Sequence, residues 1–130
     1  MDRYVTDTQA LVKFMTGRKV IDDVSHQVFL SADRGESIII IPAVALMEVL
    51  YLGEKNRIAV NLFETEDLMK SQNYQFEPLS FEIIKAASEI DDIPELHDRL
   101  IASTARYLNL PIITNDPIIL KSKWVKTLYA

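Results

Sequence analysis

The sequence predicts an α/β protein in which a central parallel sheet of about five strands lies between layers of helices. Short β-branched segments alternate along the chain with longer segments that have helical periodicity. The run Ile38–Ile41 is continuously apolar rather than alternating, which is typical of a strand covered on both faces. Glycine and proline are sparse and fall between these segments, where the chain is expected to turn.

The N-terminal part is expected to contain one strand followed by two helices. Residues Tyr4–Thr6 are β-prone and predict the first strand. A helix is expected over Thr8–Met15, and Gly17 is expected to end it. Apolar residues at three- and four-residue steps predict an amphipathic helix from Ile21 to Arg34.

The second strand, Ile38–Ile41, is also expected to lead into two helices. Pro42 suits a helix start because its missing N–H costs little there. This helix is expected to run to about Leu52, with Gly53 as its stop. Residues Asn56–Ser71 predict a further helix with one apolar side.

The rest of the chain repeats this alternation. Ser80 is expected to cap a helix over Phe81–Ile90. A second helix is expected to open at Pro94 and to run to Leu108, with Asn109 at its C-terminus. The remaining strands are expected at Tyr74–Leu79, Pro111–Thr114 and Trp124–Tyr129.

The composition suits one compact domain over residues 1–130, because 48% of the residues are apolar and 25% are charged. No apolar run approaches the roughly 20 residues that a membrane-spanning helix needs. The N-terminus has no basic stretch followed by an apolar one, so no signal peptide is expected. The absence of cysteine excludes disulfides, thiolate zinc sites and cysteine nucleophiles, and it fits a cytoplasmic location.

The net charge of −5 by itself argues against nucleic-acid binding, which usually needs a basic surface. This objection weakens if several carboxylates form a metal site, because the cation then cancels local charge and binds phosphate itself. A basic strip elsewhere is also compatible with the sequence, although a solvated surface is the simpler interpretation. The basic residues that lie close in sequence are Lys13, Arg18 and Lys19, then Lys55 and Arg57, then Lys121, Lys123 and Lys126.

Two aspartates follow predicted strands. Asp7 follows the first strand, and Asp116 lies just beyond the strand at Pro111–Thr114. If these strands are parallel, both carboxylates lie at the edge of the sheet where such folds bind ligands. The alternative for each residue alone is a structural role, because aspartate is common in turns and at helix starts.

Glu48 is surrounded in sequence by apolar and aromatic residues over Ala43–Leu52, which predicts a helix that is buried all round. A lone carboxylate in such a helix is costly to desolvate unless it is paired or bound to a cation. The alternatives are a buried ion pair, with Arg99 as one candidate, or an exposed stripe that contains Glu48.

Asp98 lies near the start of the helix predicted from Pro94, where an acidic side chain can complement the helix dipole. Ala102 and Ala105 share its face and are expected to point inward, so Asp98 is expected to project toward the sheet. Glu95 falls on the same side. It is either an accessory ligand or simply an acid in the first turn.

Oxygen-only carboxylate clusters suit hard cations such as Mg²⁺ and Mn²⁺. Such ions clamp a phosphodiester, generate hydroxide and stabilise the leaving oxygen, and this chemistry needs no histidine or cysteine. The two histidines, His26 and His97, are expected at the surface.

Four sequence blocks contain these acidic residues: Tyr4–Leu11, Glu48 in its apolar helix, Asp98–Ala105 and Leu110–Asp116. In order and spacing, over essentially the whole chain, they resemble the PIN-domain family. The resemblance implies a PIN-like three-layer α/β/α fold and metal-dependent endonucleolytic cleavage of RNA with Mg²⁺ or Mn²⁺.

The resemblance also implies roles for individual residues. Asp7, Glu48, Asp98 and Asp116 match the acidic quartet of the family. On this basis Asp7, Asp98 and Asp116 are expected to hold the principal ion, and Glu48 to orient the attacking water or complete the metal shell. Thr114 matches a hydroxyl residue that supports the site through a hydrogen bond.

In size the chain is similar to the VapC-type toxins of bacterial toxin–antitoxin modules, which are commonly homodimers held inactive by a cognate antitoxin.

Two positions, Glu95 and Gln9, depart from the pattern of the family. Many relatives have aspartate where this chain has Glu95, whose longer side chain could still reach a metal through water. Gln9 stands where serine or histidine is frequent. Arg99 is expected to be a structural partner of a carboxylate rather than a catalytic residue.

Two other functional classes remain to be weighed. Phosphoryl transfer of the haloacid-dehalogenase type needs a second aspartate two residues after the first, where this chain has Gln9. The receiver type needs a phosphorylatable aspartate after the third strand of its sheet, but Ile38–Ile41 ends in Pro42. The remaining alternative is a catalytically inactive PIN-like module that binds RNA or protein, and such a module would not be expected to bind metal.

Overall fold

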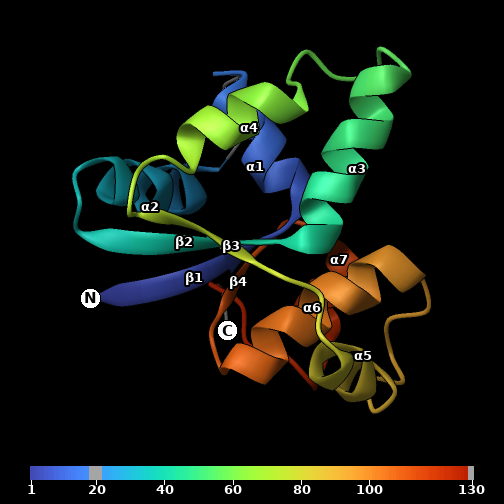
Figure 1. The fold of residues 1–130 in the computed structure, drawn as a ribbon. Helices are drawn as coiled ribbons and strands as arrows, with labels where there is room; N and C mark the ends of the chain where they lie inside the picture. Colours follow the sequence, from blue (N-terminus) through green and yellow to red (C-terminus); the bar gives the residue numbers. More distant parts are fainter. Residues whose placement is uncertain (18–21, 129–130) are drawn as a thin grey trace.

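The computed structural model describes residues 1–17 and 22–128 and contains a four-stranded parallel sheet. The strands lie in the order β3-β2-β1-β4 (Figure 1). Their bounds are Asp2–Thr6 for β1, Ser37–Pro42 for β2, Tyr74–Glu77 for β3 and Ile112–Ile113 for β4. The predicted α/β class with a central parallel sheet is therefore confirmed.

Helices cover both faces of the sheet (Figure 1). One layer contains α1 (Thr8–Met15), α2 (Asp23–Asp33), α3 (Ala43–Glu54) and α4 (Leu62–Leu68). The other layer contains α5 (Phe81–Ala87), α6 (Leu96–Leu108) and α7 (Pro117–Lys121). None of the helices within residues 1–17 and 22–128 has the length and apolar character needed to cross a membrane.

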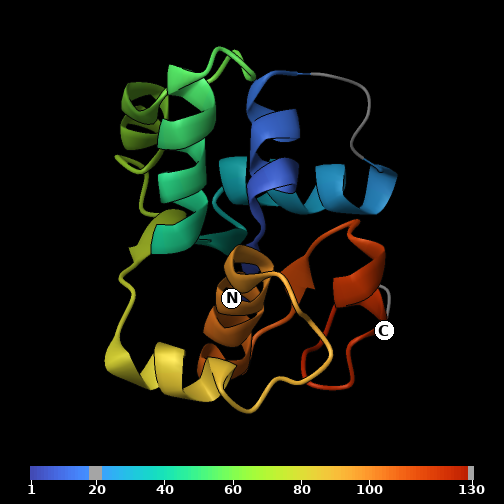
Figure 2. The same ribbon diagram turned by 90° about the vertical axis from the view of Figure 1, so that its right-hand side faces the viewer.

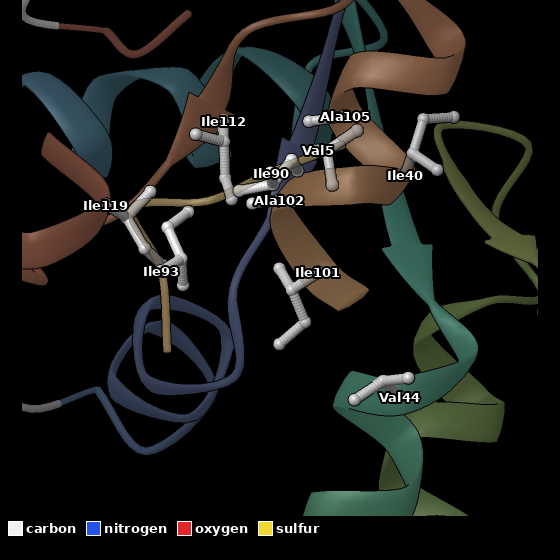
Figure 3. Packing of buried hydrophobic residues seen from close by; sticks show 10 residues of the cluster. All are labelled: Val5, Ile40, Val44, Ile90, Ile93, Ile101, Ala102, Ala105, Ile112 and Ile119. Atoms are coloured by element: carbon white, nitrogen blue, oxygen red, sulfur yellow. The ribbon is translucent and has the colours of Figure 1, made fainter. Parts of the chain in front are cut away.

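The central strand β2 separates two hydrophobic cores. Its Ile39 and Ile41 pack toward α1 and α2, where Phe29 is fully buried. Ile40 points to the opposite face and joins Ile101 of α6 in the second cluster (Figure 3). Both sides of β2 are therefore covered, which explains why its sequence is an unbroken apolar run rather than an alternating one.

Several predicted helix signals are confirmed by the backbone. Gly17 follows α1 with φ of +67°, a left-handed conformation in which glycine carries no steric penalty. The Ser80 hydroxyl accepts a hydrogen bond from the Ile83 N–H at 3.2 Å and caps α5. Asn109 ends α6 in the left-handed conformation, with φ of 55°. The predicted start at Ile21 lies outside the described residues.

The helix expected over Asn56–Ser71 was predicted too long, because α4 spans only Leu62–Leu68. Asn56 adopts a positive φ of 54° and breaks the helical path. Asn61 then caps the new helix, since its side-chain oxygen accepts a hydrogen bond from the Glu64 N–H. The apolar periodicity of Asn56–Ser71 gives no sign of the positive φ at Asn56 or of the helix start at Asn61.

Other element boundaries also differ from the predictions. Helix α3 continues through Gly53 to Glu54, and α5 ends at Ala87. Helix α6 begins at Leu96 rather than at Pro94. The segment expected to form a fifth strand contributes one parallel bridge, between Thr127 and Ile112, within the described part of the chain.

We expect Ala102→Leu to lower the free energy of unfolding by about 1–3 kcal/mol, because overpacking forces side chains and backbone to shift. Ala102 is fully buried where α6 packs on the sheet. Chemical denaturation measures the effect. The control, Tyr107→Leu on the exposed side of the same helix, is expected to change stability by no more than about 0.5 kcal/mol. Equal effects of the two substitutions would contradict the close packing of α6.

Candidate active site

The register of the sheet brings the ends of β1 and β4 to one edge. Thr6 pairs with Ile113, and the Asp7 N–H donates a hydrogen bond to the Ile113 carbonyl at 3.1 Å. Because the strands are parallel, the residues that follow them, Asp7 and Thr114, lie close together at the carboxyl edge. Figure 2 looks onto this edge and shows α1 and α3 on one side of it, with α6 and α7 on the other.

A cavity of about 260 Å³ opens at this edge. Its lining includes all four predicted carboxylate residues and Thr114. Asp7 follows β1, Glu48 lies on α3, Asp98 lies on α6, and Asp116 precedes α7. The structure therefore brings together residues that lie far apart in the sequence, as the parallel arrangement of strands requires.

Asp7 is buried, with 7% of its surface exposed, and it also begins helix α1. Its Oδ1 accepts a hydrogen bond from the Ala10 N–H at 2.8 Å. Burial raises the pKa of the Asp7 carboxyl, and this effect outweighs the hydrogen bonds from Thr114 and Ala10 that lower it. The Asp7 carboxylate therefore caps α1, and its burial makes the charged form less stable than it would be in water.

Thr114 connects Asp7 to Asp116. Its hydroxyl oxygen accepts a hydrogen bond from the Asp116 N–H at 3.0 Å, and its hydroxyl hydrogen bonds the Asp7 side chain. The Asp116 Oδ1 accepts hydrogen bonds from the N–H groups of Ile118 and Ile119, at 2.8 and 3.3 Å, and so caps α7. One hydroxyl therefore fixes the spacing between two of the carboxylates.

Glu48 accepts a hydrogen bond from the hydroxyl of Thr8, the residue next to Asp7. The alternative of an ion pair with Arg99 is not what the structure shows. The Arg99 guanidinium donates instead to the Ile93 and Pro94 carbonyls, at 2.8 and 3.0 Å. Arg99 is thus structural, but its partners are backbone carbonyls rather than a carboxylate.

The prediction that the helix carrying Glu48 is buried all round was wrong. Met47, Leu50 and Tyr51 of α3 are about half exposed, at 55%, 46% and 53%. Val44 and Val49 of the same helix are buried. The desolvation argument for Glu48 is accordingly weaker than its sequence context indicated, and its place in the site depends on its position in the cavity.

Asp98 carries the clearest electrostatic signal in the cavity. Burial, together with the negative charges of Asp116, Glu95, Glu48 and Asp7, raises the pKa of its carboxyl to about 6. Among the contacts between described residues, no hydrogen bond to the Asp98 carboxylate offsets these effects. Asp98 is therefore the quartet member with the least structural reason for its position.

Glu95 lies outside the cavity lining. Its Oε2 accepts a hydrogen bond from the Asp98 N–H at 2.7 Å, which caps α6, and its Oε1 pairs with His97 Nδ1 at 2.9 Å. His97 is half-exposed, as expected, whereas His26 is only partly exposed and lies beside the Phe14 ring. Neither histidine lines the cavity.

Sequence reasoning did not assign Thr8 or Lys13 to the site. Both residues line the cavity, together with the amide side chains of Gln9 and Asn115. The position of Thr8 directly after Asp7 was a usable signal, because a residue at the start of α1 must also lie at this edge of the sheet. Lys13 is five residues further along α1, and its direction depends on how that helix packs.

A profile of the PIN domain matches residues 4–123, which is most of the chain. The chain belongs to the PIN domain family. No relative among functionally curated proteins matches it.

Three solved structures share the fold of this PIN domain. VapBC2 from Rickettsia felis, bound to a DNA fragment from its promoter, has a TM-score of 0.73 at 19% identity, with 96% of each chain covered. DNA-bound VapBC from Salmonella typhimurium has a TM-score of 0.66 at 15% identity, covering 98% of this chain and 97% of the other. A toxin–antitoxin complex from Klebsiella pneumoniae has a TM-score of 0.64 at 20% identity, covering 95% and 96%.

The donor set of this PIN domain fits a hard divalent cation. Carboxylate and hydroxyl oxygens face the cavity, and no sulfur or imidazole ligand lines it. Within residues 1–17 and 22–128, however, no three acidic or histidine side chains are drawn together closely enough to hold an ion as they stand. Asp7, Glu48 and Asp116 are each held by a hydrogen bond within the protein. Binding an ion would therefore require these side chains to change position.

We expect the metal-free protein to become more stable as the pH falls from about 7.5 to about 5.5. The folded-state pKa of Asp98 is about 6, above its ordinary value of 3.8, so the folded protein takes up the proton first and gains stability on acidification. The Asp98 carboxyl is partly exposed to solvent, which screens the effect to about 1 kcal/mol.

Thermal unfolding in EDTA, repeated with Asp98→Asn, measures this pH dependence. The variant has no carboxyl at this position, so it should gain much less stability on acidification than the wild type. An equal gain in both proteins would show that other groups control the pH dependence.

Proposed function

We propose that this protein is a divalent-metal-dependent ribonuclease that hydrolyses phosphodiester bonds in RNA. The observation that supports this most is the convergence of four carboxylates from separate parts of the chain on one cavity. The negative charges of Asp116, Glu48 and Asp7 all raise the pKa of Asp98, alongside its burial and Glu95. Such an arrangement costs stability unless a cation is meant to share the site.

In this proposal Asp7, Asp98 and Asp116 hold Mg²⁺ or Mn²⁺, and Glu48 completes the metal shell or orients the attacking water. The ion, when bound, supplies activation of water and stabilisation of the charge that develops on the phosphate and the leaving oxygen. Glu48 lines the cavity, where its carboxylate can accept a hydrogen bond from a water molecule.

Two hydroxyls support this arrangement. Thr8 donates to Glu48 and limits the positions that its carboxylate can take. Thr114 holds Asp7 relative to Asp116. Glu95 acts at longer range, through its charge on Asp98 or through a bridging water, because both of its oxygens already accept hydrogen bonds or ion pairs within the protein.

A second candidate function is a PIN-like module that binds RNA or protein without cleaving it. One observation favours it: three carboxylates of the quartet have structural hydrogen bonds and would be needed for the fold alone. The raised pKa of Asp98 argues against it, because that carboxylate costs stability and has no such bond.

We further propose that the protein is the toxin component of a toxin–antitoxin module and that a cognate antitoxin binds it. The support is its fold: the similar solved structures are toxin–antitoxin complexes, and their chains are matched over nearly their whole length. A nuclease that cleaves cellular RNA would harm the cell that makes it unless an inhibitor were bound to it.

A homodimer is also proposed, on the basis of exposed apolar side chains on the edge strand β3 and on helices α3, α4 and α5. They are Met47, Leu50 and Tyr51 on α3, Phe63 on α4, Phe76 on β3, and Phe81 and Ile84 on α5. Phe63 and Phe81 are 75% and 72% exposed, which is costly for an isolated chain in water. Burial of these side chains against a second copy would remove that cost.

We expect the purified protein to cleave mixed-sequence RNA with Mn²⁺ or Mg²⁺ but not in EDTA. Asp98→Asn should lower the rate by about 100-fold or more, because it removes a ligand charge. The matched control is Asp67→Asn, which removes an exposed carboxylate on α4.

Calorimetry of Mn²⁺ binding accompanies the cleavage assay. Absence of both cleavage and metal binding in the wild type would overturn the nuclease proposal in favour of the binding module. Full activity of Asp98→Asn would show that the protein is a nuclease but that Asp98 is not needed in its active site.

We expect light scattering after size-exclusion chromatography to give the mass of a dimer for the wild type and of a monomer for Phe81→Glu. The substitution places a charge in the proposed apolar contact, while Phe81 itself is too exposed to support the monomer fold. Circular dichroism of the variant controls for folding. A wild-type protein that is monomeric at high concentration would exclude the homodimer.

A further inference from the structure

One face of α1 extends the cavity away from the carboxylates. Gln9 and Lys13 lie one helical turn apart, so they project from the same side of the helix. Both residues line the cavity. Lys13 is the only lysine or arginine among the described residues that do so. A cationic group therefore faces the same space as the acidic quartet.

The Lys13 ammonium is close to the carboxylates without being paired to them. Lys13 and Asp7 line the same cavity, and the positive charge of Lys13 lowers the pKa of Asp7 against the larger effect of burial. Yet none of the ion pairs within 4.0 Å formed among residues 1–17 and 22–128 includes Lys13. Its charge is available to a ligand in the cavity.

A structural explanation accounts for only part of this position. Lys13 lies in the last turn of α1, where a cation is favourable for the helix dipole. That effect is equally available to a side chain that points to open solvent. It does not explain why a lysine in particular lines a cavity that five carboxylate residues also line, the quartet and Asp22.

The negative charge of an RNA substrate explains the position of Lys13 in the cavity. The protein has a net charge of −5 and its cavity is acidic, so an RNA strand is repelled wherever a metal ion does not intervene. A lysine ammonium is a compact charge with three donors that binds phosphate oxygens as a point charge. Placed beside the carboxylates, it can hold the phosphate backbone while the reacting linkage lies at the quartet.

We propose that Lys13 binds a phosphate oxygen of the RNA strand at this site, with Gln9 contributing an amide contact to the same strand. This inference rests on the proposed ribonuclease function. Lys13 then acts on substrate binding and position, and takes no part in holding the metal. Asn115, which follows β4 at the same edge of the sheet, also lines the cavity.

The test is binding of a labelled, mixed-sequence single-stranded RNA, measured by fluorescence anisotropy over a series of salt concentrations. Ca²⁺ serves as the hard cation, and a gel verifies that the RNA stays intact. Lys13→Gln should weaken binding by up to about fivefold. It should also reduce the slope of log K against log salt by roughly 0.7, the contribution of one phosphate contact on a single strand.

The controls separate this role from general charge and from folding. Lys85→Gln removes an exposed lysine of α5 that does not line the cavity, and it should leave the salt slope unchanged. Lys13→Arg should retain most of the binding. Calorimetry with Mn²⁺ should show that Lys13→Gln binds metal at least as tightly as the wild type, because a repelling cation has been removed.

The outcomes distinguish the two proposals. Wild-type protein that cleaves RNA, together with a Lys13→Gln variant that has unchanged affinity and salt slope, would overturn the role of Lys13 alone. Loss of metal binding in Lys13→Gln would also overturn it, since the defect would then be in the site's structure. Wild-type protein that neither binds nor cleaves RNA with any metal would overturn both proposals.

Discussion

The pairing of β1 with β4 is the constraint on which the rest of the site depends. It joins the two ends of the chain, because Thr6 is held in register with Ile113. The parallel direction places Asp7 and Thr114 at one edge, and Thr114 in turn holds Asp116. A shift of one residue in this register would exchange the hydrophobic cores that Ile112 and Ile113 face, and it would move Asp7 away from Thr114. Stability of the core and geometry of the site therefore follow from the same pairing.

Helix starts are the second means by which the fold fixes the site. Asp7 caps α1, Asp116 caps α7, and Glu95 caps α6. Each cap places a carboxylate at the positive end of a helix dipole, which lowers the cost of holding anionic groups near one another. Asp98 is positioned differently, by the close packing of α6 through Ala102 and Ala105. Its carboxyl is partly buried and faces the negative charges of Asp116, Glu95, Glu48 and Asp7, and these effects together raise its pKa.

Much of this arrangement was predictable from sequence, because it depends on local signals that are strong. The unbroken apolar run of β2 indicated its central place, and the positions of Asp7 and Asp116 after strands indicated a shared edge. The limits of α4 were not predictable, since they depend on the left-handed conformation of Asn56 and on the cap from Asn61. In the described part of the last predicted strand, the Ile112 N–H donates a hydrogen bond to the Lys126 carbonyl and Thr127 forms one bridge with Ile112, while the neighbouring residues are irregular.

Predictions about individual site residues succeeded or failed for the same kind of reason. Thr114 could be placed because it ends a strand, and strand ends have a defined position. The environment of Glu48 was misjudged, because the apolar residues around it are exposed on α3 rather than buried. Lys13 was grouped with other basic residues by its neighbours in sequence, whereas its significance comes from the direction in which α1 packs. Periodicity identifies a face of a helix, but it does not identify the elements or the cavity that this face contacts.

The double use of Asp7 and Asp116 has an evolutionary consequence. Since both carboxylates begin helices, a descendant that no longer cleaved anything would still be selected to keep them, or to replace them with asparagine, another strong capping residue. Retention of these two acids in a lineage is therefore a record of the architecture as much as of an activity. Asp98 has no cap to maintain, and drift would remove it first. Substitution of Asp98 in such a lineage would therefore mark the point at which cleavage activity was lost.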